Sequence, residues 1–160
     1  MSFPITQAIR FLREKNIEFT PHQFEYREKG GTSHSSSMLG VEEDLVVKTL
    51  IFETNEKEPF VVLMEGPKMV STKKMARVLG VKSVGPVTPE RANRLSGYLV
   101  GGTSPFGMKN ELKVFAEESI FTKAKIFING GARGFLVEID PLDLLDALDP
   151  GLVNVGVERH

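Results

Sequence analysis

The sequence predicts an α+β fold in which helices surround one mixed, curled, barrel-like β-sheet. Strand patterns outnumber helix patterns along the 160 residues. Two pairs of neighbouring strand segments are joined by short turns, which predicts antiparallel hairpins. The chain has no internal repeat and no long linker, so we expect a single domain over residues 1–160.

Five segments carry helix signals. Thr6 can cap a helix that continues to Lys15. The other four are expected at 32–39 with Thr32 or Ser33 as the cap, at 71–79, at 88–95 and at 140–148. In the helix at 71–79 we expect Met75, Val78 and Leu79 to face the core.

The strongest strand signal is 45–52, where β-branched residues dominate, and 59–65 supplies its returning partner. Further strands are expected at 17–24, 82–84, 112–115, 125–128, 135–139 and 152–157. Pro21 lies within the first of these, and proline cannot donate to a strand ladder. We therefore expect 17–24 at an edge of the sheet.

Composition excludes several chemistries. The chain has no cysteine, so disulfides, thiol nucleophiles and thiolate metal sites are absent. His22, His34 and His160 are far apart in sequence and lack a metal-ligand spacing, so we expect no metal site. No secretion signal and no membrane-spanning run is visible, and we expect a cytoplasmic protein without a membrane partner.

Charge is distributed unevenly along the chain. The net charge is only −1, yet residues 68–133 hold 12 lysines and arginines against 4 acidic residues, a balance of +8. Such a segment is typical of proteins that bind RNA or a phosphorylated metabolite, although the same charges can also be scattered over several solvated faces. Sequence alone leaves both interpretations open.

Twelve residues, 98–109, contain Gly101, Gly102 and Gly107 directly after a short apolar run. Glycines this dense indicate sharp turns or the close approach of backbone to a ligand. We therefore expect the loop to form the floor of a binding site. Ser104 precedes a proline and lies outside the nucleophile motif of serine hydrolases, so a turn hydroxyl that positions nearby backbone is favoured over a nucleophile.

Two basic residues stand in unusual places. Lys48 interrupts the apolar strand at 45–52, where it either reaches an edge with its charged end or points into a cavity that holds an anion. Arg133 lies between alanine and glycine in a second glycine-rich turn. It is a solvated turn charge by default and a phosphate contact if it faces the first glycine loop.

Three segments together resemble the YbaK-type aminoacyl-tRNA editing domains, which include editing domains of prolyl-tRNA synthetase. They are 47–50 (Val-Lys-Thr-Leu), 98–107 (Tyr-Leu-Val-Gly-Gly-Thr-Ser-Pro-Phe-Gly) and 130–134 (Gly-Gly-Ala-Arg-Gly), in this order and at the family's spacing. Lys73-Lys74 and Leu79-Gly80 add to the match. The resemblance extends from the first expected helix to the last, and it implies a fold like that of these editing domains.

The resemblance implies a free-standing deacylase that hydrolyses the ester of mischarged tRNA, with Cys-tRNA(Pro) as the leading substrate. Lys48 matches the family's functional lysine, and Gly101 and Gly102 match the glycines that line the pocket for the terminal adenosine and aminoacyl group. The residues expected to bind substrate are Thr103, Ser104, Pro105, Phe24, Gly130, Gly131 and Arg133. The implied partners are the acceptor end of tRNA, that for proline first, and prolyl-tRNA synthetase. No cofactor and no metal is implied.

The chain departs from the family pattern at two positions. Leu136 stands where some members have aspartate, and Phe24 stands where some have tyrosine. Both changes remove polar groups near the expected pocket, so alanine or serine esters remain open as substrates. Two other classes also remain open: a non-catalytic tRNA-binding or synthetase-associated module, and a binder of a nucleotide or adenylate.

Overall fold

The computed structural model describes residues 2–159. Its main sheet runs in the order β1-β8-β7-β2-β3-β6-β9, and β5 pairs with β2 beside this path. The strands are β1 (Thr20–Gln23), β2 (Val46–Thr54), β3 (Pro59–Glu65), β5 (Val84–Pro86), β6 (Lys113–Glu117), β7 (Ile126–Ala132), β8 (Phe135–Ile139) and β9 (Gly151–Val153). A separate pair joins β4 (Lys68–Val70) to β10 (Gly156–Glu158).

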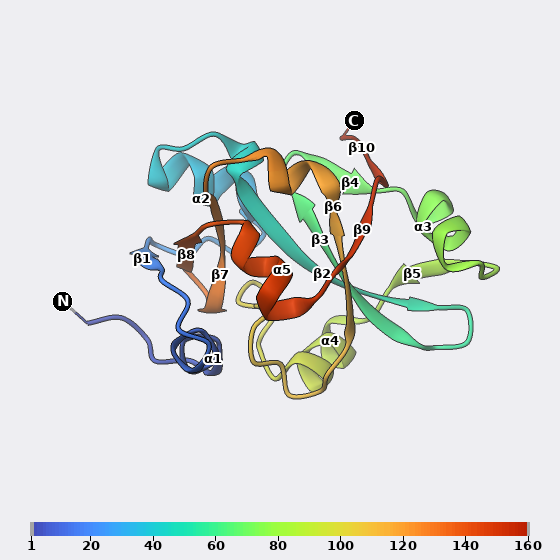
Figure 1. The fold of residues 1–160 in the computed structure, drawn as a ribbon, viewed down its shortest axis with the longest axis horizontal. Coiled ribbons are helices and arrows are strands. Elements are labelled where there is room, and N and C mark those ends of the chain that lie inside the picture. Colours follow the sequence, from blue (N-terminus) through green and yellow to red (C-terminus); the bar gives the residue numbers. More distant parts are fainter. Residues whose placement is uncertain (1, 160) are drawn as a thin grey trace.

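Helices cover both faces of the sheet (Figure 1). They are α1 (Gln7–Glu14), α2 (Gly31–Leu39), α3 (Thr72–Leu79), α4 (Pro89–Ser96) and α5 (Leu142–Leu148), with short 3₁₀ turns η1 (Glu43–Leu45) and η2 (Glu118–Thr122). On β2, Val47 and Ile51 share the main core with buried residues of α1 and α5. Val46 and Phe52 point the other way, because side chains alternate along a strand. They pack in two smaller clusters that also include residues of α2 and α3.

One edge of β2 is divided between two partners. Val46 and Val47 pair in parallel with Phe127 and Ile128 of β7. Pairing on β2 with β5 begins only at Phe52. Among the described residues, the stretch 48–50 therefore has a strand neighbour on its β3 side alone. This gap lies inside the sequence segment that carries Lys48.

A buried carboxylate ties the C-terminal segment to the sheet. Glu117, at the end of β6, is 1% exposed. It accepts hydrogen bonds from the backbone N–H of Val155 at 2.7 Å and of Gly156 at 2.9 Å. These bonds satisfy a buried charge with backbone donors. They fix the point at which the chain leaves β9 and enters β10.

The structure confirms the predicted fold class and most of the predicted elements. Thr6, Ser71 and Thr88 cap α1, α3 and α4 through their side chains. Both hairpins form, and β1 lies at the sheet edge. Across residues 2–159, no helix is long and apolar enough to cross a membrane.

Four expectations were wrong in detail. The second helix begins at Gly31, because the Thr32 hydroxyl donates to Glu43 instead of capping. Val78 is 53% exposed, so α3 buries Met75 and leaves Val78 in solvent. The short strand expected at 82–84 lies at 84–86, and the tail forms two strands where one was expected. β4 carries no strand pattern of its own and exists because β10 pairs with it.

Candidate active site at the two glycine turns

The two glycine-rich turns lie against one another. Gly101 has φ of +94°, and a Cβ added there would lie 2.6 Å from the Tyr26 hydroxyl. A Cβ added at Gly102 would lie 2.9 Å from backbone atoms of Ala132 and Arg133. Both approaches are closer than any side chain permits. Glycine is therefore required at Gly102 by the contact between the turns and at Gly101 by the contact with Tyr26.

Asn129 joins the two turns by hydrogen bonds. Its carbonyl oxygen accepts from the N–H of Gly131 at 2.6 Å and of Ala132 at 3.2 Å. Its amide nitrogen donates to the Gly101 carbonyl at 3.2 Å. One side chain thereby shapes the bulged end of β7 and fixes the loop opposite.

Arg133 adds a second link between the turns. Its Nε donates to the Val100 carbonyl at 2.9 Å. Its guanidinium lies over the Tyr26 ring, 5.1 Å from the ring centre. Because Tyr26 also lies against Gly101, these two side chains close the outer rim of the turns.

Buried groups support the glycine loop from behind. Tyr98 donates to the Phe106 carbonyl at 2.5 Å, and burial raises the pKa of this tyrosine to about 12. Thr6 donates to the Gly130 carbonyl at 2.5 Å. Ser104 is 0% exposed, and its hydroxyl accepts from the Phe106 N–H at 3.2 Å. Ser104 therefore has the geometry of a turn hydroxyl.

The backbone amides of the loop divide into used and free donors. The Gly102 N–H donates to the Leu99 carbonyl at 2.8 Å within the turn. The N–H groups of Gly101 and Thr103 have no acceptor among residues 2–159. Gly101 is exposed and Thr103 is half-buried. The donors that can meet a ligand are thus those of Gly101 and Thr103.

Lys48 lies at the gap in β2. It directly follows Val47, the last residue of β2 that pairs with β7, and Asn129 directly follows Ile128, the partner of Val47. It is half-buried, and its ammonium donates to the Lys68 carbonyl of β4 at 2.5 Å. Burial lowers the pKa of Lys48, nearby Arg159 lowers it further, and Glu43 opposes both effects. The neighbouring Thr49 hydroxyl is buried and has no partner among the described residues.

Glu43 organises the charges around Lys48. It accepts from the Thr32 hydroxyl at 2.7 Å and from both terminal nitrogens of Arg159 at 3.2 Å. Burial acts to raise the pKa of Glu43, but these donors outweigh it and the pKa is lowered. Glu43 is therefore an anion that faces the lysine from η1 while Arg159 faces it from the C-terminal segment.

An apolar wall borders the turns on the α2 side. Leu136 is 5% exposed and packs with Val46, Phe127 and Phe24. The Phe24 ring meets the His34 ring edge-on, with 5.8 Å between ring centres. The two positions that depart from the family pattern thus lie in one cluster and make it apolar.

The structure brings most of the expected site residues together. Gly101, Gly102, Gly130, Gly131 and Arg133 meet at the turns, with Thr103 beside them. Pro105, like Ser104, is buried beneath the loop. The Lys48 ammonium points to β4 and makes no hydrogen bond to the loop. Sequence reasoning missed Tyr26 and Asn129, although asparagine before Gly-Gly is a known turn signal.

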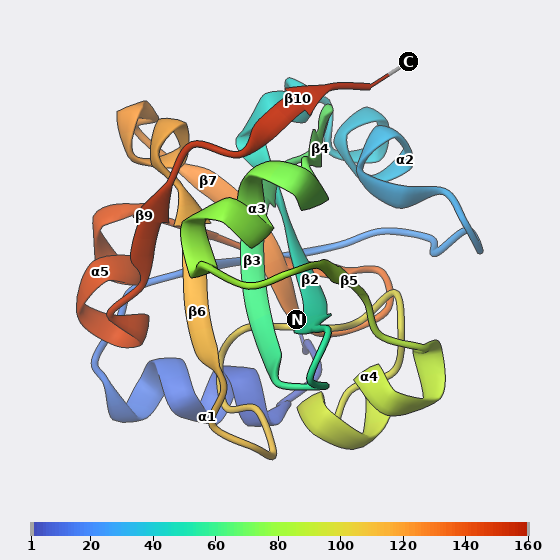
Figure 2. The same ribbon diagram turned by 90° about the vertical axis from the view of Figure 1, so that its right-hand side faces the viewer.

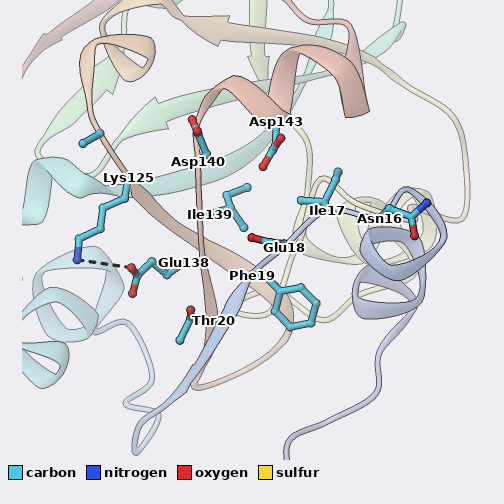
Figure 3. Close-up of a pocket in the computed structure, with 11 residues that line it drawn as sticks. Asn16, Ile17, Glu18, Phe19, Thr20, Lys125, Glu138, Ile139, Asp140 and Asp143 are labelled. Atoms are coloured by element: carbon cyan, nitrogen blue, oxygen red, sulfur yellow. Dashed lines mark ion pairs between the residues drawn. The ribbon is translucent and has the colours of Figure 1, made fainter.

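A hollow of about 850 Å³ lies elsewhere, between the chain before β1, the end of β8 and the start of α5 (Figure 3). It contains none of the expected site residues. Glu138 at its wall is paired with Lys125 at 3.5 Å and with His22 at 2.9 Å. Across residues 2–159, no three His, Cys, Asp or Glu side chains gather as a metal would require. His160 lies outside the described residues.

Comparison with known proteins shows the family to which this chain belongs. The family of aminoacyl-tRNA editing domains matches residues 31–147. The chain therefore belongs to this family, which confirms the resemblance seen in the sequence and the enzyme class of aminoacyl-tRNA deacylases.

Individual relatives place the chain within the family. It is 28% identical over 141 residues to EbsC of Enterococcus faecalis, described as a candidate Cys-tRNA(Pro)/Cys-tRNA(Cys) deacylase, covering 88% of this chain and 86% of that protein. It is 34% identical over 85 residues to a proline–tRNA ligase of Nitratidesulfovibrio vulgaris, covering 53% of this chain but only 15% of the ligase. The solved structure of a candidate trans-editing enzyme for prolyl-tRNA synthetase shares the fold with TM-score 0.83 at 18% identity, over 100% of both chains.

Proposed function

We propose that this chain is a trans-editing deacylase that hydrolyses the ester of mischarged tRNA, with Cys-tRNA(Pro) as the leading substrate. The observation that carries the proposal is the pair of free, fixed N–H groups at Gly101 and Thr103 beside the gap in β2. Family membership and the EbsC relative support it independently.

The chemistry needs no side-chain nucleophile. Water attacks the ester carbonyl carbon, and the carbonyl oxygen takes up negative charge. Backbone N–H groups held in place by Asn129 and Arg133 are suited to stabilise that charge, because fixed donors need not reorganise during the reaction. The intermediate then expels the ribose oxygen, which takes up a proton as the bond breaks. A hydroxyl or amine of the substrate itself can guide the water.

Lys48 has the role of a cation in this proposal. Its lowered pKa arises from burial and from Arg159, and an incoming phosphate or oxyanion would offset both. On substrate binding, the Lys48 ammonium either breaks its hydrogen bond to the Lys68 carbonyl and contacts the substrate, or keeps that bond and stabilises the substrate's negative charge from a distance. In either case it need not accept a proton from water.

The apolar wall formed by Leu136 and Phe24 influences which aminoacyl ester the enzyme would hydrolyse. Leu136 and Phe24 offer no hydrogen bond to a substrate hydroxyl, whereas they can contact a thiol or a methyl group. This favours cysteine or alanine esters over serine, since a hydroxyl buried without a partner is costly. Alanine is therefore the second candidate.

A panel of tRNAs charged with cysteine, alanine, serine or proline tests the proposal directly. We expect release of the mismatched amino acid from tRNA(Pro), with cysteine fastest and proline slowest. Lys48→Ala should lower turnover on the order of 10²-fold. Lys57→Ala is the matched control, because Lys57 is an exposed turn lysine paired only with Glu53. Stoichiometric tRNA binding with no turnover on any substrate would contradict the proposal and favour a binding module.

A further inference from the structure

The segment that carries α3 and β5 is rich in positive charge and contains no acidic residue. Between Glu65 and Glu90 the chain has no aspartate or glutamate. The same segment carries five basic residues: Lys68, Lys73, Lys74, Arg77 and Lys82. Figure 2 shows α3 lying across the front of β3, with β5 running beside it.

Three of these residues line one groove. Lys73 and Arg77, one helical turn apart on α3, line a groove of about 480 Å³ together with Lys82. Thr72 and Ser83 add hydroxyl groups to its walls. Lysine, arginine and hydroxyl side chains are those that contact nucleic-acid phosphates.

The groove cations lack partners within the protein. Several other basic residues are paired with carboxylates, namely Lys57, Lys68, Arg91, Lys123, Lys125 and Arg159. Over residues 2–159, Lys73, Arg77 and Lys82 form no ion pair. Like charges at positions i and i+4 of a helix destabilise it. An external anion bound between Lys73 and Arg77 would offset this repulsion.

The groove shares a sheet face with Lys48. Met75 of α3 packs in the cluster that contains Met64, and Met64 is the cross-strand partner of Lys48. A ligand that occupies both the groove and the glycine turns must be extended and negatively charged along its length. We propose that the groove formed by Lys73, Arg77 and Lys82 binds the phosphate backbone of the tRNA acceptor arm. This inference rests on the proposed function, because it takes tRNA as the substrate.

The test removes the three charges together, with Lys73→Gln, Arg77→Gln and Lys82→Gln in one variant. The matched control removes three cations from α1, with Arg10→Gln, Arg13→Gln and Lys15→Gln. That helix packs on the opposite face of the sheet. Because removing Lys73 and Arg77 relieves a repulsion, the groove variant should fold at least as well as the parent chain. Binding of labelled, uncharged tRNA is followed by fluorescence anisotropy between 50 and 200 mM salt.

We expect the groove variant to bind tRNA about tenfold or more weakly. Its salt dependence should fall by roughly 2 to 3 in the log–log slope, at about 0.7–0.9 for each phosphate that the protein no longer neutralises. The control should retain affinity and slope. Hydrolysis of a short aminoacyl-CCA fragment should be equal in parent and variant, since the fragment cannot reach the groove. Unchanged affinity and slope in the groove variant would overturn the inference. So would binding to vesicles containing phosphatidylglycerol that is lost in the groove variant while tRNA binding is not.

Failure of the two proposals can be told apart. If the parent chain binds tRNA through the groove but releases no amino acid, the groove stands and the proposed activity does not. If the parent chain hydrolyses mischarged tRNA while the groove variant binds and turns over equally well, the groove alone is excluded.

Discussion

The Lys48 ammonium donates a 2.5 Å hydrogen bond to the carbonyl oxygen of Lys68. This bond joins the gap in β2 to β4, a strand that exists only through its pairing with β10. Burial lowers the pKa of Lys48, Arg159 after β10 lowers it further, and Glu43 on η1 opposes both effects.

Substitutions at Arg159 and Glu43 should shift the pKa of Lys48 in opposite directions. Arg159→Gln should raise the pKa of Lys48, because a neighbouring positive charge is removed. Glu43→Gln should lower it, because the opposing anion is removed. NMR titration of the Lys48 side chain measures both shifts. Shifts of the same sign in the two variants would contradict the placement of these charges.

The same titration has a consequence for stability. The folded-state pKa of Lys48 lies below the unfolded value, so the unfolded chain binds more protons between the two. The penalty for burying the charged lysine is therefore full below the folded pKa and is relieved as pH rises toward 10.5. Lys48→Met should flatten this alkaline gain. Urea unfolding at several pH values above 8 measures the difference.

Gly101 and Gly102 should differ in how an alanine substitution can be rescued. Gly101→Ala places a methyl group against the Tyr26 hydroxyl and forces a positive φ, which together cost about 1–3 kcal/mol. Adding Tyr26→Phe should recover part of that stability. Gly102→Ala meets the backbone of Ala132 and Arg133, so no trimming of a side chain helps. Thermal unfolding and deacylation of the single and double variants test the contrast, and equal rescue at both positions would contradict it.

Tyr98 should make the fold sensitive to alkali. Its pKa of about 12 lies above the value of 10.0 for a free tyrosine, so its stabilising effect is complete below pH 10 and is lost as pH rises toward 12. Tyr98→Phe leaves the buried Phe106 carbonyl without its donor, at a cost of about 1–3 kcal/mol at neutral pH. The variant should also lose less stability between pH 8 and 11 than the parent chain. Chemical unfolding across that range measures both effects.

Asn129 should be needed as both donor and acceptor. Asn129→Asp keeps an acceptor for Gly131 and Ala132 but replaces the donor to Gly101 with an oxygen. We expect this variant to fold and to lose deacylation by at least tenfold, because the loop is released from the turn. Asn129→Ala should lose both activity and stability. Full activity in Asn129→Asp would show that the bond to Gly101 does not position the site.

Local signals made much of this fold predictable. The helix caps at Thr6, Ser71 and Thr88 and the hairpin of β2 with β3 are all encoded within a few residues. β4 was missed because its partner β10 lies more than eighty residues later, and no local pattern reports such a pairing. Val78 was wrongly predicted to be buried, because the spacing of apolar residues on α3 does not reveal how much of the helix surface the sheet covers.

The candidate site divides in the same way. Glycine density located both turns, and an unusual lysine in an apolar strand located Lys48. Tyr26 could not be found from sequence, because its role comes from lying against Gly101, seventy-five positions away. Sequence also could not show which backbone N–H groups of the loop are free. The Gly102 N–H is used because it closes a turn onto the Leu99 carbonyl, and this bond is visible only in the folded chain.

The hydrogen bond from Thr6 to Gly130 spans 124 residues, and the pairing of Arg159 with Glu43 spans 116. Contacts this distant in sequence form late, since loop closure must come first. During synthesis, the turn around Gly130 cannot be braced until residue 130 has left the ribosome, and the charges around Lys48 are completed only when Arg159 has followed. Helix α3 is tied to the same late segment, because the Ser71 N–H at its start donates to the Val155 carbonyl at 2.8 Å. Its basic surface and the glycine turns are therefore both completed late in synthesis.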